Sequence, residues 1–165
     1  MSLVFVDCEA YGNCPATGQL TEFGAVVYPT RATFHGVIVR SRPSAANPAI
    51  PEPDGEPYST ETAAQVFTAF EAWLTQHSKG NRPIFVSDNV AFDWQWINDG
   101  FWRHLGRNPF GHSGRRLSDF YAGLRGDFRQ TQAWKRLRVT PHDHHPVHDA
   151  LGNLEAFERL LKGER

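Results

Sequence analysis

Cysteine is scarce in this sequence, which has two among its 165 residues. Cys8 and Cys14 lie six positions apart and form no CxxC pair, so their spacing excludes a disulfide framework and a cysteine-based zinc site. There is also no continuous run of about 20 apolar residues, and no basic segment followed by an apolar one at the start. These absences favour a cytoplasmic protein with reduced thiols.

An excess of positive charge is missing too, because 17 Lys and Arg face 18 Asp and Glu, a net charge of −1. The charges are unevenly distributed. Nine of the basic residues lie between positions 103 and 138, where only Asp119 and Asp127 interrupt them. This distribution fits a protein that contacts phosphates with one region and holds cations with another, although a solvated pair of basic helices has the same pattern.

The length predicts one domain over residues 1–165, and a hydrophobic content of 40% is enough for a core. Short apolar runs predict strands over residues 3–6, 23–28, 33–40 and 83–86. Helical spacing predicts one helix after a cap at Ser59 or Thr60 and a second with Phe92, Trp96, Ile97 and Phe101 on one side. Further helices are predicted over 118–125, over 130–138 and from Pro146 onward. The proline-rich segment 41–58 is expected to be a loop. This order favours a mixed sheet flanked by helices.

Two carboxylates end the first predicted strand. Side chains alternate along a strand, so Asp7 and Glu9 point to the same face. Adjacent carboxylates repel each other, and a hard divalent cation such as Mg²⁺ relieves that repulsion by taking oxygen ligands. A frayed strand end with solvated acids has the same sequence, so this pair alone leaves both interpretations open.

A second acidic motif, Ser87-Asp88-Asn89-Val90-Ala91-Phe92-Asp93, follows the strand predicted at 83–86. It places Asp93 in the first turn of a helix, where the helix dipole favours a carboxylate. Either Asp88 or Asp93 would also serve as a simple helix cap.

A histidine-rich segment with four His in seven residues, 142–148, leads into the last predicted helix, whose first turn contains Asp149. Histidine titrates near neutral pH, so an imidazole here is suited to accept a proton from water.

Together, these motifs resemble those of the DEDDh family of 3′–5′ exonucleases. Asp7-Cys8-Glu9 resembles the DxE motif, residues 89–93 resemble NxxFD, and residues 144–150 resemble HxxxxDA. Residues 21–26 (TEFGAV) also look like the strand that follows DxE in this family, and two longer strings resemble its small RNase AS-like exoribonuclease branch. The resemblance covers nearly the whole chain. It implies an α/β RNase H-like fold, with a mixed five-stranded sheet (an antiparallel meander plus parallel strands) flanked by helices.

The same resemblance implies roles for individual residues. The expected ligands of two Mg²⁺ or Mn²⁺ ions are Asp7, Glu9, Asp93 and Asp149, with Asp7 shared by both ions and Asp93 acting largely through water. His144 lies five residues before Asp149 and is the expected proton acceptor, with His145 as the alternative if the loop is shifted by one residue. The implied reaction releases nucleoside 5′-monophosphates from the 3′ end of single-stranded RNA, or of DNA as the alternative, or from 3′ overhangs.

Substrate contacts are expected around these motifs. Ala10 and Tyr11 follow the first motif where many relatives have Thr and Gly, and the Tyr11 ring is suited to stack on a terminal base, although a plain loop tyrosine fits equally. Asn89 and Phe92 belong to the second motif. In the basic region, Trp134 is a candidate for base stacking and Arg136 for phosphate binding. The dimeric habit of the closer relatives implies a homodimer.

Parts of the sequence also fit three other classes of protein. His148-Asp149 occurs in HD phosphohydrolases, but those are all helical, and this chain begins with strands. A zinc site made from His142, His144, His145 and His148 would leave Asp7 and Glu9 unexplained. A binding module without catalysis would not require all four acids and the histidine.

Overall fold

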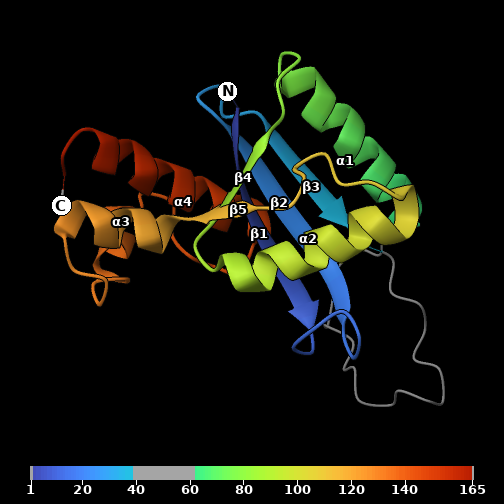
Figure 1. Ribbon diagram of the computed structural model, residues 1–165, viewed down its shortest axis with the longest axis horizontal. Helices are drawn as coiled ribbons and strands as arrows, with labels where there is room; N and C mark the ends of the chain where they lie inside the picture. The colour runs from blue at the N-terminus through green and yellow to red at the C-terminus, as the bar shows by residue number, and fades with distance from the viewer. Residues whose placement is uncertain (1, 39–61, 165) are drawn as a thin grey trace.

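The computed structural model describes residues 2–38 and 62–164. Its centre is a mixed five-stranded sheet with the strand order β3-β2-β1-β4-β5 (Figure 1). The strands are β1 (Leu3–Tyr11), β2 (Gln19–Tyr28), β3 (Thr33–Val37), β4 (Ile84–Ser87) and β5 (Gly114–Arg116). β1, β2 and β3 pair antiparallel, whereas β4 runs parallel to both β1 and β5. The predicted mixed five-stranded sheet is therefore confirmed.

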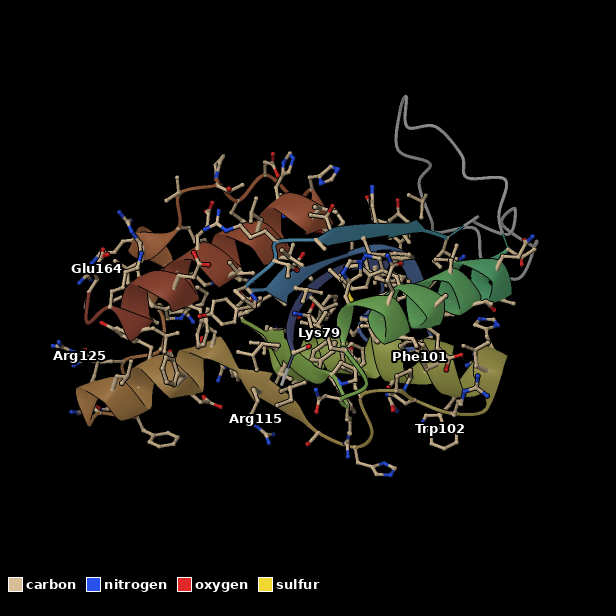
Figure 2. All side chains as sticks on the ribbon, turned by 90° about the horizontal axis from the view of Figure 1, so that it is seen from above. Lys79, Phe101, Trp102, Arg115, Arg125 and Glu164 are labelled. Carbon is tan, nitrogen blue, oxygen red and sulfur yellow. The ribbon has the colours of Figure 1, made fainter. Side chains whose placement is uncertain are left out.

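Helices cover both faces of this sheet. They are α1 (Ala63–His77), α2 (Val90–Leu105), α3 (Leu117–Arg125), the 3₁₀-helix η1 (Ala133–Leu137) and α4 (Pro146–Leu161). Figure 2 shows α4 on one side of the sheet and α1 and α2 on the other. Within α2, Phe101 is buried in the core, with its ring against Phe67 and Phe70 of α1, while the next residue, Trp102, points outward and is 48% exposed. None of the helices in the described ranges combines the length and apolarity needed to cross a bilayer.

Alternation along β1 decides which side chains reach which helices. Val4, Val6 and Cys8 belong to the cluster that packs against α1 and α2. Phe5 faces the other way and packs with Ala150 and Leu154 of α4. Asp7 and Glu9 share the orientation of Phe5, so this alternation directs both carboxylates to the face that α4 covers.

Helix ends follow recognisable local signals. Thr62 caps α1 through a capping box with Gln65, and α2 ends at Gly106, whose φ of 65° is the left-handed conformation that glycine tolerates. Pro146 begins α4, as predicted. The predicted caps Ser59 and Thr60 and the predicted loop 41–58 lie outside the described residues.

Candidate metal centre

Three of the predicted carboxylates meet between β1 and the first turn of α4. One oxygen each of Asp7, Glu9 and Asp149 lies within 4.8 Å of the others. Asp149 is 1% exposed and Asp7 is 9% exposed, whereas Glu9 is half-buried at the strand end. The alternation of β1 supplies the first two side chains and the start of α4 supplies the third, so the site depends on how closely α4 approaches the sheet.

Gly24 is the residue that allows this approach. It pairs with Asp7 across β1 and β2, and a Cβ atom at Gly24 would lie 2.3 Å from backbone atoms of Pro146 and Val147. Real Cβ atoms do not come so close to a backbone, so the first turn of α4 can lie here only because position 24 has no side chain.

Gly24→Ala is therefore expected to push the first turn of α4 away from β1. We expect the free energy of unfolding to fall by about 1–3 kcal/mol, the usual cost of overpacking. Urea denaturation measures it. The matched control is Gly123→Ala in α3, where a Cβ would meet nothing within 4 Å; it should be neutral or stabilising. Equal stability of the two variants would contradict this role of Gly24.

Asp93 lies behind Asp7 rather than among the three clustered oxygens. It is 2% exposed; its Oδ1 accepts the backbone N–H of Cys8 at 3.0 Å, and its Oδ2 accepts the hydroxyl of Ser87. β1 pairs with β4 only over Leu3–Phe5. Farther along β1, the Asp93 carboxylate accepts the Cys8 N–H, a backbone donor that β4 no longer reaches. The other candidate of this motif, Asp88, is held by Lys135 at 3.0 Å and Arg138 at 3.4 Å, which favours Asp93.

The electrostatic environment penalises negative charge. Burial, together with the charges of Asp93 and Asp149, raises the pKa of Asp7 to about 9. Burial also raises the pKa of Asp93 to about 7, against the hydrogen bond from Ser87, which lowers it. The pKa of Glu9 is raised as well, mainly by burial. A divalent cation would compensate these charges, so the residues present fit a metal centre.

These shifts predict how stability depends on pH in the metal-free protein. Between the ordinary carboxyl pKa of 3.8 and about 9, folded Asp7 binds more protons than unfolded Asp7, so stability must fall as pH rises. We expect the free energy of unfolding in EDTA to decrease between pH about 5 and about 8, and Asp7→Asn to flatten that slope. Urea denaturation at both pH values measures this. An unchanged slope in Asp7→Asn would contradict it.

The histidines separate into two groups. His145 stacks on His148 with ring centroids 4.3 Å apart and lies 4.8 Å from the ring of His35, toward β3. The Nδ1 of His148 is 2.9 Å from Asp143, and this hydrogen bond lowers the pKa of the Asp143 carboxyl. The geometry therefore supports neither His145 as the alternative proton acceptor nor a zinc site made from all four histidines.

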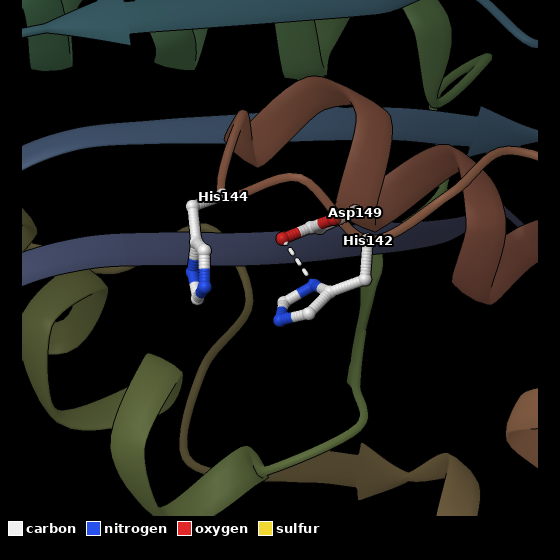
Figure 3. A group of neighbouring side chains, drawn as sticks. All are labelled: His142, His144 and Asp149. Atoms are coloured by element: carbon white, nitrogen blue, oxygen red, sulfur yellow. Dashed lines mark ion pairs between the residues drawn. The ribbon is translucent and has the colours of Figure 1, made fainter.

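His142 and His144 form the second group, on the exposed side of the carboxylates. Figure 3 shows their rings flanking the carboxylate of Asp149. The Nδ1 of His142 is 2.5 Å from Oδ2 of Asp149, and the Nδ1 of His144 is 3.7 Å from Oε1 of Glu9. His144 has a φ of 62°, and the Asp143 side chain accepts the N–H of His145 across this turn. The loop thus places His144 beside the carboxylate cluster.

The residues predicted to contact substrate lie in different environments. Trp134 is fully buried, and its Nε1 donates to Ser118 and to the Thr131 carbonyl, so its assignment to base stacking was wrong. Trp96 of α2 is also a core residue and is 3% exposed. The other candidates lie near the carboxylates or on the surface, and their roles stay predictions: Ala10 and Tyr11 at the end of β1, Asn89 and Phe92 at the start of α2, and exposed Arg136 in η1.

Two residues were assigned no role at the carboxylate site from the sequence, His142 and Ser87. His142 lies seven residues before Asp149 in a non-helical loop, so its separation along the sequence does not predict its distance from Asp149. Ser87 ends β4, and the alternation of side chains along that strand was the signal that could have predicted which face Ser87 points to.

Known proteins that resemble this chain include exonucleases. No family model matches the sequence. The chain is 32% identical over 99 residues to the 3′-5′ DNA exonuclease Cap18 of Escherichia coli, an alignment that covers 56% of this chain and 53% of that protein. The chain thus spans about half the length of the curated relative it matches.

Solved structures match over almost the full chain at low identity. The nuclease domain of 3′hExo, a DEDDh family member bound to rAMP, has a TM-score of 0.68 at 16% identity and covers 98% of this chain and 92% of that one. The zinc-bound Exonuclease I–ssDNA complex of Escherichia coli has a TM-score of 0.64 at 15% identity and covers 99% and 41%. The predicted RNase H-like fold is confirmed, and so is the resemblance to the DEDDh 3′–5′ exonucleases. The resemblance to the RNase AS-like branch stays a prediction.

Proposed function

We propose that this DEDDh-like chain is a metal-dependent 3′–5′ exonuclease that hydrolyses the terminal phosphodiester of a single strand. The observation that carries the proposal is the meeting of Asp7, Glu9 and Asp149 within 4.8 Å at the junction of β1 and α4. The chain brings these acids together from opposite ends of the sequence, and nothing in the packing of the core requires three charges there.

The donor set fits hard divalent cations. Asp7, Glu9 and Asp149 offer carboxylate oxygens, which Mg²⁺ and Mn²⁺ prefer. The Oδ2 atom of Asp149 is buried and accepts no aligned hydrogen bond among the described residues, although the Nδ1 of His142 lies 2.5 Å away. A ligand at this oxygen would offset the cost of a buried acceptor whose hydrogen bonding is unsatisfied. We propose that two ions bind here, with Asp93 acting from behind Asp7. When bound, they would supply Lewis-acid activation of water and charge stabilisation on the phosphate.

The remaining chemistry falls to the side chains. His144 accepts the proton of the attacking water; its ring is 76% exposed and therefore reaches solvent, and it lies beside Glu9. The attack releases a nucleoside 5′-monophosphate and leaves a shortened strand with a free 3′ hydroxyl.

The choice between DNA and RNA as substrate rests on the relatives. Cap18 is named a DNA exonuclease, and this relative favours the DNA-directed alternative over the predicted exoribonuclease activity. The 3′hExo domain, by contrast, was solved with a ribonucleotide. We therefore propose single-stranded DNA as the first substrate class and RNA as the second.

A comparison of substrates tests the proposal. Labelled single-stranded DNA, single-stranded RNA and duplexes with 3′ overhangs are incubated with Mg²⁺ or Mn²⁺, and the products are separated. We expect nucleoside 5′-monophosphates from at least the single-stranded DNA, and none in EDTA. Nucleoside 3′-monophosphates, or internal cleavage of every substrate, would contradict the proposed reaction.

Arg136 provides a test of phosphate binding. Several other basic side chains between residues 103 and 138 already pair with acids, as Arg129 does with Asp127 at 3.1 Å, whereas the structure assigns exposed Arg136 no ion pair among the described residues. We expect Arg136→Ala to weaken oligonucleotide binding and to reduce the slope of log affinity against log salt by about 1. Arg129→Ala is the control. Equal slopes in both variants would leave Arg136 outside the interface.

A further inference from the structure

A second group of potential metal ligands lies next to the carboxylate cluster. His142, His144 and Asp149 each offer one ligand atom, and these three atoms lie within 4.8 Å of one another (Figure 3). This group shares Asp149 with the carboxylate cluster, but its other two donors are imidazole nitrogens. We propose that it is a distinct site for a nitrogen-preferring transition metal, with Zn²⁺ as the ion that fits best.

The donor atoms select the metal. Mg²⁺ prefers oxygen ligands, whereas Zn²⁺ binds readily to two imidazoles and one carboxylate. Three protein ligands with a fourth position left to water is also a common zinc arrangement. The two imidazoles of His142 and His144 therefore make this site favour Zn²⁺ over Mg²⁺, the ion proposed for catalysis.

The carboxylate oxygen of this group is prepared for a ligand. The Asp143 backbone N–H donates to Oδ1 of Asp149 at 3.3 Å, which fixes the carboxylate. Its Oδ2 is buried, has no hydrogen-bond partner and faces the histidines. The Nδ1 of His142 is only 2.5 Å from Oδ2, but that contact is not aligned as a hydrogen bond.

Only small movements are needed to reach a zinc geometry. Zinc bonds of about 2.0–2.1 Å at tetrahedral angles place neighbouring ligand atoms roughly 3.3 Å apart. The contact between His142 and Asp149 must open slightly, and His144 must turn inward. Both imidazoles can move, because their side chains are 50% and 76% exposed.

Occupancy has a consequence that rests on the proposed function. A zinc ion here would engage the lone pair of His144 and the Oδ2 oxygen of Asp149 together. The proton acceptor and one carboxylate would both be withdrawn from hydrolysis. Zn²⁺ is therefore expected to lower the rate supported by Mg²⁺, and chelation of zinc should restore it.

Zinc binding to the full chain tests the site without relying on activity. Calorimetric titration with Zn²⁺ is carried out in excess Mg²⁺, which fills sites made only of oxygen ligands. We expect one zinc site in the wild type, loss of that site in His142→Ala, and retention in His148→Ala, whose ring contacts Asp143 instead. Retention in His142→Ala, or loss in His148→Ala alone, would overturn the inference.

A second measurement needs no substitution. Imidazole resonances of the wild-type protein are followed by NMR during the same titration. Zinc should shift the signals of His142 and His144 and leave those of His35 and His77 in place. Absence of shifts at His142 would overturn the zinc site. Hydrolysis with Mg²⁺ in zinc-free buffer reports separately on the proposed function, so the two can fail independently.

Discussion

Asp149→Asn should lower Mg²⁺-dependent hydrolysis by about three orders of magnitude, which corresponds to about 4 kcal/mol of lost transition-state stabilisation. Asparagine keeps the shape of the side chain and an oxygen for the Asp143 amide. It removes the charge and places an N–H₂ group where Oδ2 now lies, next to the Nδ1 of His142. Initial rates on a labelled oligonucleotide measure the effect.

The matched control for this substitution is Asp119→Asn. Asp119 also lies in the first turn of a helix, but it is exposed and pairs with Arg116 at 3.3 Å. Its removal should leave the rate within about twofold, since exposed ion pairs contribute little. Circular dichroism should show that both variants are folded. Wild-type activity in a folded Asp149→Asn would remove the basis of the proposed site.

His144→Ala is expected to reduce the rate by about 10²–10⁴-fold, the usual contribution of a positioned proton acceptor. His144 is the histidine that lies 3.7 Å from Glu9, and its loss should leave the carboxylates in place. Initial rates on a labelled oligonucleotide in saturating Mg²⁺ measure the effect.

His145→Ala and His148→Ala are the controls for this prediction. Their rings stack on each other, away from the carboxylates, so both variants should keep most of the wild-type rate. A His145→Ala protein that is inactive while His144→Ala is active would reverse the assignment.

Much of the fold could be predicted because the relevant signals are local. The apolar run before Asp7 identifies β1, and Pro146 with the helical spacing after it identifies α4. These two elements carry the three clustered acids. β5 was not located, because Gly114-Arg115-Arg116 is a three-residue strand without an apolar pattern. Its place depends on pairing with β4, which is a tertiary property.

The candidate site was predicted less completely, for the same reason. Asp7, Glu9 and Asp149 follow from motif spacing, but the position of His142 beside Asp149 depends on the path of a loop. Trp134 shows the opposite error. It lies in a basic segment that suggested base contacts, yet its ring packs with Leu117, Tyr121 and Leu160 in a core cluster. Sequence composition does not distinguish a buried ring from an exposed one.

The direction of degradation is the most direct test of the account. An oligonucleotide labelled at its 5′ end is incubated with the full chain and Mg²⁺, beside the same strand with a blocked 3′ end. We predict a ladder that shortens by one nucleotide at a time from the free 3′ end, no shortening of the blocked strand, and no ladder in EDTA. Release of the labelled 5′ nucleotide first, or equal degradation of the blocked strand, would contradict a 3′–5′ exonuclease built on Asp7, Glu9 and Asp149.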